Sequence, residues 1–255
     1  MQNLIKTEIE IQTMREGGRL IAQMVQELGE MIRPGLDTWD LEVKFIEMCA
    51  QNKVRPACKG YSPYSYPPFP TGLCVSINQE VVHGIPKKGI KLKNGDIVTL
   101  DTVIEHKGYY VDHAITFPVG EIGVERRKLL KTAKEGLDKA IELVKDGTKV
   151  GAISSSMQKT AEDNGYSVSR DYVGHGIGEE MHEDPQIACF GNPKDGPILK
   201  AGMTICIETL YAQGTHRIKH KGYWISETLD GKDFAQFEHT VLVKDGGFEI
   251  LTLPN

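Results

Sequence analysis

Apolar residues recur at helical spacing in two pairs of segments. The first pair covers residues 15–32 and 38–50, and the second covers residues 125–144 and 150–164. Within each segment the apolar positions follow the period of an amphipathic helix. Turns that contain glycine separate the two members of each pair. The pattern therefore predicts two pairs of helices.

Each helical pair precedes a segment with the pattern of a strand, and the two strand segments resemble each other. Residues 92–101 and 199–208 align without a gap. Each segment has a glycine at a predicted turn, continues through apolar residues and ends in a carboxylate, which is Asp101 in the first copy and Glu208 in the second. Two helices followed by antiparallel strands, repeated once, predict an α+β fold with pseudo-twofold symmetry.

Two aspartates flank the polar turn at residues 105–108, between two runs that have the pattern of strands. This arrangement predicts a β-hairpin. If the turn is centred between His106 and Lys107, Asp101 lies opposite Asp112, and their β-carbons are about 4.5–5.5 Å apart. Two like charges at that distance are destabilising unless one is protonated or a cation lies between them. A divalent metal ion is the natural candidate.

Further oxygen and nitrogen ligands for such an ion occur in the second half of the chain. His175 and His182 lie in a glycine-rich run, Glu208 follows an apolar run, and Glu238 precedes a β-branched run. Burying a carboxylate in an apolar strand is costly unless it is paired or binds a metal. A bound metal ion would therefore explain the two glutamates as well as the two aspartates.

Length and composition narrow the class of protein. At 255 residues with a net charge of −5, the chain gives no general reason to expect nucleic acid or an anionic membrane as its main partner. We expect one catalytic domain over residues 1–255, with repeats of about 13–120 and 121–250, because neither half would bury its apolar surface alone. No segment has the length of a signal peptide or a bilayer span, so we expect a cytoplasmic protein.

The cysteines and the remaining histidines indicate structural roles. The five cysteines include no C-x-x-C pair, which argues against a disulfide framework and against a structural zinc cluster. His239 could be structural or functional. We expect core or structural positions for the following residues: Cys49, Cys189, Cys206, His106, His113, His216 and His220.

Residues 61–70 combine prolines and aromatic residues in an order that suits neither a helix nor a strand. The segment is predicted to be a loop. A surface loop stiffened by proline is the commoner outcome of such a composition. The alternative is that its aromatic residues form the wall of an apolar pocket.

Five motifs occur in order along the chain. They are residues 78–86, residues 95–98 leading to Asp101 and Asp112, residues 174–178 with His182, residues 202–204 leading to Glu208, and residues 235–240. Five motifs in the right order and spacing are much more specific than any one of them. Together they resemble the short, type I methionine aminopeptidases over nearly the whole length of the chain.

The resemblance implies the pita-bread fold, whose pseudo-symmetry agrees with the internal repeat. It also implies five ligands for two divalent ions, which are Asp101, Asp112, His175, Glu208 and Glu238, with Asp112 and Glu238 bridging the ions. Four carboxylates and one imidazole suit manganese, ferrous iron, cobalt or zinc. The resemblance is to relatives without a zinc-binding N-terminal extension and without the helical insertion of the type II enzymes.

The resemblance also implies catalytic roles. Two metal ions would make water a nucleophile near neutral pH and would hold the substrate amine and carbonyl. Glu208 would carry a proton from the nucleophile to the leaving amine. His182 would donate to the scissile carbonyl, and His83 would contact the substrate amide nitrogen or assist the leaving group.

An apolar pocket for the side chain of an N-terminal methionine is implied at Tyr61, Phe69, Cys74, Met181 and Trp224. Three features depart from the family pattern. Residues 179–181 replace basic and phenylalanine residues that are common before the second histidine, a threonine stands at position 209 where proline is usual, and the loop at residues 61–69 is longer than in most bacterial forms. None of these changes removes a metal ligand.

Three functions agree with the sequence. The leading one is removal of the initiator methionine from nascent proteins when the second residue is small. The second is cleavage of Xaa-Pro bonds, and the third is a non-catalytic pita-bread protein that binds nucleic acid or protein partners. We expect a monomer. Lysines at positions 87, 88, 91 and 93 form either a solvated face or a patch that contacts ribosomal RNA transiently.

Overall fold

Four α-helices occur in the computed structural model, which describes residues 4–254. They are α1 (Glu8–Met31), α2 (Thr38–Asn52), α3 (Val124–Ile141) and α4 (Val150–Asp163). These confirm the two pairs of helices predicted from the apolar pattern. Helix α1 begins earlier than predicted because Thr7 and Glu10 form a capping box. The Thr7 hydroxyl accepts from the Glu10 N–H, and the Glu10 carboxylate accepts from the Thr7 N–H.

The described strands form one large sheet and one small sheet. The large sheet has ten strands, with the central order β1-β4-β5-β12-β9-β7-β8, while β2, β6 and β13 pair with β4, β9 and β12 respectively. The small sheet contains β10, β11 and β3. The bounds of the large sheet are β1 (Arg55–Pro56), β2 (Cys74–Ile77), β4 (Ile97–His106), β5 (Tyr109–Pro118), β6 (Ser167–Val168), β7 (Val173–Gly176), β8 (Glu183–Ala188), β9 (Thr204–Ala212), β12 (Phe234–Lys244) and β13 (Gly247–Ile250). Those of the small sheet are β3 (Glu80–Val81), β10 (Ile218–His220) and β11 (Ser226–Thr228).

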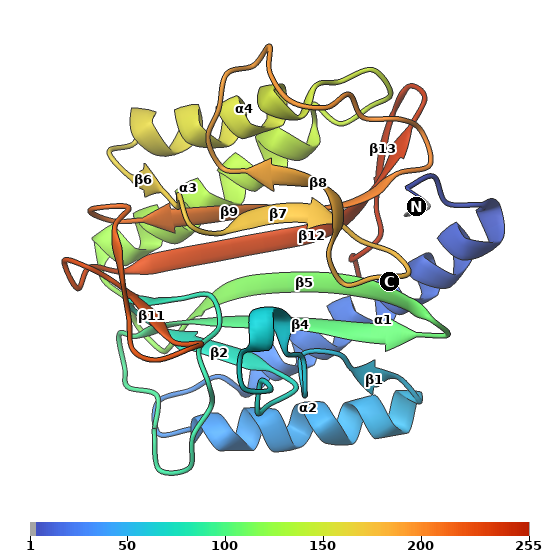
Figure 1. Cartoon of the computed structure of the whole chain (residues 1–255). Coiled ribbons are helices and arrows are strands. Elements are labelled where there is room, and N and C mark those ends of the chain that lie inside the picture. The colour runs from blue at the N-terminus through green and yellow to red at the C-terminus, as the bar shows by residue number, and fades with distance from the viewer. Residues whose placement is uncertain (1–3, 255) are drawn as a thin grey trace.

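The helix pairs lie against different parts of the large sheet (Figure 1). Helix α1 contacts β4 and β5, and α3 contacts β9 and β12. A buried apolar cluster lies under each pair, and Ile115 on β5 packs against both clusters. The four strands that form the middle of the sheet are therefore supported by helices from both halves of the chain.

The β4–β5 hairpin is present, but its predicted register is wrong. The turn is formed by Lys107 and Gly108, which both have positive φ, and the two strands pair Asp101 with Ala114. A two-residue turn with positive φ at both positions matches the right-handed twist of a hairpin, and glycine accepts it without strain. Asp101 and Asp112 are consequently diagonal neighbours on one face of the hairpin and not directly opposite.

Residues 166–173 do not form one continuous strand. Only Ser167 and Val168 pair with β9, and β7 begins at Val173. Between them the Ser169 hydroxyl accepts from the N–H groups of Asp171 and Tyr172. Such a side-chain turn competes with strand pairing. By contrast, the loop expected at residues 61–70 contains only the single 3₁₀ turn Pro63–Ser65, as predicted.

In the described part of the chain, no helix is both long and apolar enough to cross a membrane.

Candidate metal centre

The five predicted ligands lie on five neighbouring strands. Following the sheet order from β4 to β7, they are Asp101 on β4, Asp112 on β5, Glu238 on β12, Glu208 on β9 and His175 on β7. Each strand therefore contributes one ligand. The convergence explains why four carboxylates interrupt otherwise apolar strands.

The strand register places these side chains in two adjacent rows on one face of the sheet. In the first row, Asp101 pairs with Ala114, Ala114 pairs with Glu238, and Glu238 pairs with Glu208. Residues two positions apart on a strand share a face, so the next row lies on the same side. There His175 pairs with Cys206, Cys206 pairs with Thr240, and the Thr240 hydroxyl accepts from the Asp112 N–H at 3.0 Å.

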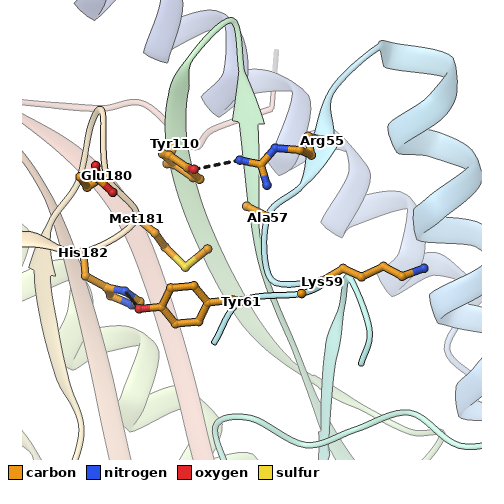
Figure 2. Close-up of a pocket in the computed structure, with 9 residues that line it drawn as sticks. Arg55, Ala57, Lys59, Tyr61, Tyr110, Glu180, Met181 and His182 are labelled. Carbon is orange, nitrogen blue, oxygen red and sulfur yellow. Dashed lines mark hydrogen bonds between the residues drawn. The ribbon is translucent and has the colours of Figure 1, made fainter. Parts of the chain in front are cut away.

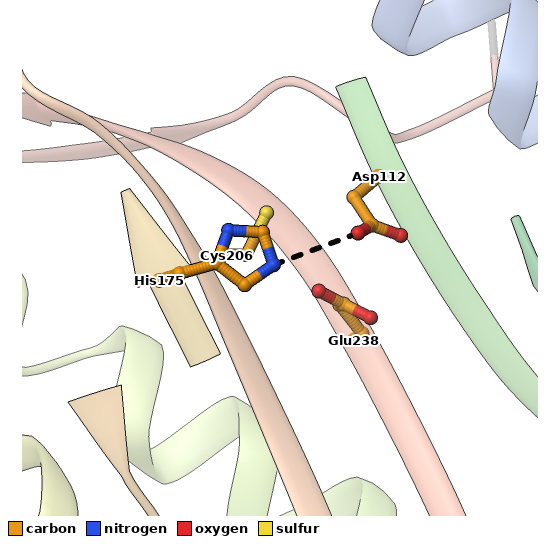
Figure 3. Close-up of side chains that lie close together, drawn as sticks. All are labelled: Asp112, His175, Cys206 and Glu238. Atoms are coloured by element: carbon orange, nitrogen blue, oxygen red, sulfur yellow. Dashed lines mark ion pairs between the residues drawn. The ribbon is translucent and has the colours of Figure 1, made fainter. Parts of the chain in front are cut away.

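The second row and Glu238 bring ligand atoms close together. Suitable atoms of Asp112, His175, Cys206 and Glu238 all lie within 4.8 Å of one another. Figure 3 shows these four side chains meeting between the strands, with Nε2 of His175 3.7 Å from Oδ2 of Asp112. All five predicted ligands line one cavity of about 120 Å³. The spacing is suitable for a small cation.

Burial and mutual repulsion disfavour the charged forms of these carboxyl groups. Burial raises the pKa of Asp101 to about 6 and that of Glu208 to about 8. The pKa values of Asp112 and Glu238 lie well above their usual range, first because of burial and then because of neighbouring carboxylates. Burial also lowers the pKa of His175 to about 3, so the imidazole is neutral. Among the described residues that line this cavity there is no lysine or arginine, so none of them supplies a positive charge to balance the carboxylates.

Two carboxylate oxygens also lack hydrogen-bond donors. Oδ1 of Asp112 and Oε1 of Glu238 are buried and have no partner among the described residues. Buried acceptors of this kind are normally satisfied by a donor or by a cation. Carboxylate oxygens with a neutral imidazole nitrogen fit a divalent metal ion.

Cys206 is fully buried, as expected for a core residue, but it also belongs to the metal-ligand cluster. Burial, together with Glu238 and Asp112, raises the pKa of its thiol well above the usual range. Only a thiolate is a strong metal ligand. Cys206 is thus less suited to bind metal than the carboxylates that surround it.

Both histidines with predicted catalytic roles line the same cavity. The ring of His182 lies 4.4 Å from that of His175, measured between centroids, and its Nδ1 is 2.8 Å from the Tyr61 hydroxyl. Burial lowers the pKa of His83 to about 4, and its ring makes an edge contact with Tyr172 at 5.4 Å. Both imidazoles therefore face the metal site from outside the ligand set. Tyr172 was not identified from the sequence.

The residues predicted to form the methionine pocket fall into two groups. Phe69 and Trp224 contact each other at 5.2 Å, and both contact the His83 ring, while Cys74 pairs with Asp101 across β2 and β4. Tyr61 and Met181 instead line a second cavity of about 300 Å³. Figure 2 shows Met181 beside the Tyr61 ring and His182. His182 lines both cavities and so separates them.

Comparison with known proteins identifies the family. A model of metallopeptidase family M24 matches residues 12–245. The chain belongs to metallopeptidase family M24. It is similar to methionine aminopeptidase 1 of Bacillus subtilis, with 40% identity over 98% of both chains, and to methionine aminopeptidase of Clostridium acetobutylicum, with 41% identity over 98% of both chains.

Solved structures of M24 peptidases confirm the pita-bread fold. Methionine aminopeptidase from Thermotoga maritima superposes with a TM-score of 0.93 and 42% identity, covering 98% of each chain. Prolidase from Pyrococcus furiosus gives a TM-score of 0.76 at 22% identity, and the match covers 99% of this chain and 66% of the prolidase. The second likeness shows the shared fold alone. Membership in M24 and the buried ligand cluster together establish a divalent-metal peptidase.

Gln236 is a residue of this M24 site that the sequence analysis missed. Its Nε2 is 3.2 Å from Oε2 of Glu208 and 3.4 Å from Oδ2 of Asp101. The amide therefore orients two of the predicted ligands at once. A signal was present in the sequence, because Gln236 lies two positions before Glu238 and so shares its face of β12.

Replacing Gln236 with methionine should weaken manganese binding by about 10–100-fold, which is typical for the loss of a group that orients metal ligands. Titration calorimetry on metal-stripped protein measures this change. Gln213→Met, just beyond the end of β9, is the matched control and should leave the affinity unchanged. Equal affinities in the Gln236 variant and the control would show that the amide does not orient the ligands.

Proposed function

We propose that this M24 peptidase removes the N-terminal methionine from nascent proteins when the second residue is small. The observation that carries the proposal is the convergence of four carboxylates and one imidazole on one face of the sheet, where two carboxylate oxygens have no donor among the residues that the structure describes. The full-length similarity to proteins named methionine aminopeptidase supports the choice of substrate.

We infer that Asp101, Asp112, His175, Glu208 and Glu238 would hold two divalent ions. When bound, such ions would supply Lewis-acid chemistry for activating water and polarising the scissile carbonyl. The hard oxygen donors suit manganese, ferrous iron, cobalt or zinc. Glu238 pairs with Glu208 on one side and with Ala114 on the other, and this central place in the row supports its role as a ligand.

Glu208 is proposed to carry the proton from the attacking water to the leaving amine. In the metal-free protein burial first, and then the charge of Asp101, raises its pKa to about 8, whereas a bound cation would favour the ionised carboxylate that can accept the proton. The Gln236 amide holds one oxygen of this carboxyl in place. These conditions suit a group that must accept and release a proton during each turnover.

His182 is proposed to donate to the scissile carbonyl oxygen. If the Tyr61 hydroxyl donates to Nδ1 of His182, the ring hydrogen lies on Nε2, which leaves that nitrogen able to donate to substrate. His83, which lines the same cavity, is proposed to contact the substrate amide nitrogen. Its neutral ring, held by burial, can accept a hydrogen bond there.

The methionine side chain is proposed to lie against Phe69, Cys74 and Trp224, with Tyr61 and Met181 across His182. A thioether fits such a wall because sulfur–aromatic contacts contribute about 0.3–1.5 kcal/mol each. Trp224 is held in place by a hydrogen bond from Nε1 to the Pro67 carbonyl, at 2.9 Å. The long loop at residues 61–70 thus supports the pocket through backbone as well as side-chain contacts.

We further propose a cytoplasmic monomer in which residues 1–255 form one catalytic domain. Its partners would be the N-terminal segments of nascent proteins. The four lysines between positions 87 and 93 would provide a transient contact with the ribosome, because clustered positive charge favours the RNA backbone.

Peptide cleavage tests the proposed function. Metal-stripped protein reloaded with manganese or cobalt should release methionine from Met-Ala-Ser and leave Ala-Pro-Ala intact, and Asp101→Asn should abolish the release. Chromatography of the products measures both reactions. Cleavage of the prolyl peptide alone would indicate an Xaa-Pro peptidase, and absence of cleavage with any metal would indicate a binding protein.

A further inference from the structure

A buried ion pair joins the start of the chain to the loop that carries His182. Nζ of Lys6 lies 2.6 Å from Oε2 of Glu183, and the two side chains are 1% and 3% exposed. Lysine and glutamate are almost never buried to this extent unless they are paired. The pair lies outside the set of groups with proposed metal-binding or catalytic roles, although Glu183 directly follows His182.

The backbone around Lys6 is arranged to admit its side chain. The Lys6 N–H donates to the Gly202 carbonyl at 2.8 Å, which ties the segment before α1 to the turn that precedes β9. A β-carbon on Gly178 would overlap Cε of Lys6 and would lie 2.9 Å from Oε1 of Glu183. Gly178, the last glycine of the Gly-His-Gly-Ile-Gly motif, is therefore needed for the lysine stem to pass beneath the loop.

Glu183 holds the other side of the same loop. Its Oε1 accepts from the Glu180 N–H at 3.1 Å, and the Gly178 N–H donates to the Glu180 carbonyl at 3.1 Å. The Gly178 carbonyl in turn accepts from the Tyr110 N–H at 2.8 Å. The loop between β7 and β8 is thus held on one side by strand β5 and on the other by the Lys6–Glu183 pair. His182 belongs to this loop.

Stability alone is a poor explanation for such a pair. Desolvation of two charges offsets most of their attraction, and apolar replacements of similar volume are often as stable or more stable. A pair that also fixes a loop has a further consequence, because a shift of about 1 Å in a catalytic group can lower the rate about 100-fold.

We propose that Lys6 and Glu183 are positioning residues that hold His182 in its orientation toward the substrate carbonyl. The inference rests on the catalytic role proposed for His182. The segment before α1 would then contribute to catalysis through Lys6, although it contains none of the metal ligands and none of the predicted pocket residues.

A double-mutant cycle with His182→Ala tests this role. Lys6→Met should lower kcat for Met-Ala-Ser about 100-fold, with manganese affinity changed less than about threefold. In the His182→Ala background, the same substitution should lower kcat less than about threefold further, because non-additivity marks groups that act as a unit. Arg15→Met is the matched control, since it removes another N-terminal ion pair, Arg15–Glu249 at 2.6 Å, that does not contact the loop.

Amide hydrogen exchange gives a readout that does not depend on activity. Lys6→Met should accelerate exchange at Tyr110, Gly178 and Glu180, whereas Arg15→Met should not. If Lys6→Met is too unstable to study, Lys6→Met/Glu183→Leu removes both charges together and should show the same loss of kcat in a folded protein.

The outcomes separate this inference from the proposed function. Failure of the wild-type protein to release methionine would refute the function, and the exchange rates would still decide whether Lys6 anchors the loop. Release by the wild type, with unchanged exchange in Lys6→Met or with fully additive losses in the cycle, would overturn the positioning role alone.

Discussion

Replacing Glu238 with glutamine should lower kcat/KM by about a thousandfold or more and abolish tight metal binding, while the metal-free protein becomes more stable. The loss follows from the removal of a ligand whose bound ion is expected to contribute several kcal/mol of transition-state stabilisation. The two effects have opposite signs. This combination distinguishes a metal ligand from a residue that merely supports the fold.

The gain in stability has its origin in the crowding of carboxyl groups. Glu238 pairs with Glu208 across the sheet, and its Oε1 has no hydrogen-bond partner among the described residues. Burial and the charges of Asp112, Glu208 and Asp101 raise its pKa well above the usual range. A neutral amide of nearly the same shape removes this repulsion, so chemical denaturation of metal-free protein should give a higher free energy of unfolding.

Glu105→Gln is the matched control for this experiment. Glu105 lies on the neighbouring β4–β5 hairpin of the same sheet, but it is partly exposed and pairs with Arg55 at 2.8 Å. Its replacement should change neither metal stoichiometry nor kcat/KM, and the free energy of unfolding should fall by no more than about 1 kcal/mol. Retention of full manganese stoichiometry in Glu238→Gln would contradict the ligand assignment.

The helices could be predicted from sequence because their signals are local. Apolar residues at the helical period determine which face of α1 to α4 is buried, and no distant partner is needed to recognise the pattern. The ligands Asp101, Glu208 and Glu238 could be identified for a related reason, since a charged residue in a buried strand is conspicuous.

The hairpin register could not be derived from polarity alone. A turn centred one residue earlier would also place both aspartates on one face, because a shift of this kind preserves the parity of the pairing. The register is set by the turn at Lys107 and Gly108, because glycine accepts the positive φ that the tight turn requires. Turn geometry therefore decided between two arrangements that the apolar pattern could not separate.

Contacts between distant segments could not be predicted from the sequence for a different reason. Lys6 has no unusual local context, and Gln236 is marked only by its spacing from Glu238, so the roles of both depend on partners that the fold brings to them. The two cross-strand rows likewise appear only when β5, β12 and β9 are placed side by side. Sequence patterns thus predicted the candidate metal ligands, while the fold is needed to show that they converge and which residues orient them.

The metal-free protein should lose stability as the pH rises from 6.5 to 8, and saturating manganese should remove or reverse this loss. Glu208 has an ordinary pKa of 4.5, which burial raises to about 8 in the folded protein. Across this window the folded state keeps a proton that the unfolded state has released, so raising the pH favours unfolding. Each such carboxyl contributes up to about 1.4 kcal/mol per pH unit.

The lower limit of the window follows from the buried histidines. Burial lowers the pKa of His83 and His113 to about 4 and that of His175 to about 3, from an ordinary value of 6.5. Below pH 6.5 the unfolded state binds the extra protons at these rings, so stability there rises with pH and opposes the carboxyl effect. Above pH 6.5 the histidine contribution fades and is nearly complete about one pH unit higher, so the carboxyl groups increasingly determine the slope across the window.

Urea denaturation with a chelator, at half-unit steps between pH 6.5 and 8, measures this slope. Glu208→Gln should make it shallower, because one of the retained protons is lost with the carboxyl. With manganese present, the ligands must be deprotonated to bind the ion, so affinity rises with pH and stabilises the folded state further. A flat profile in the chelated wild-type protein would mean that the carboxylates are already ionised without a cation, and the electrostatic case for the metal centre would then fail.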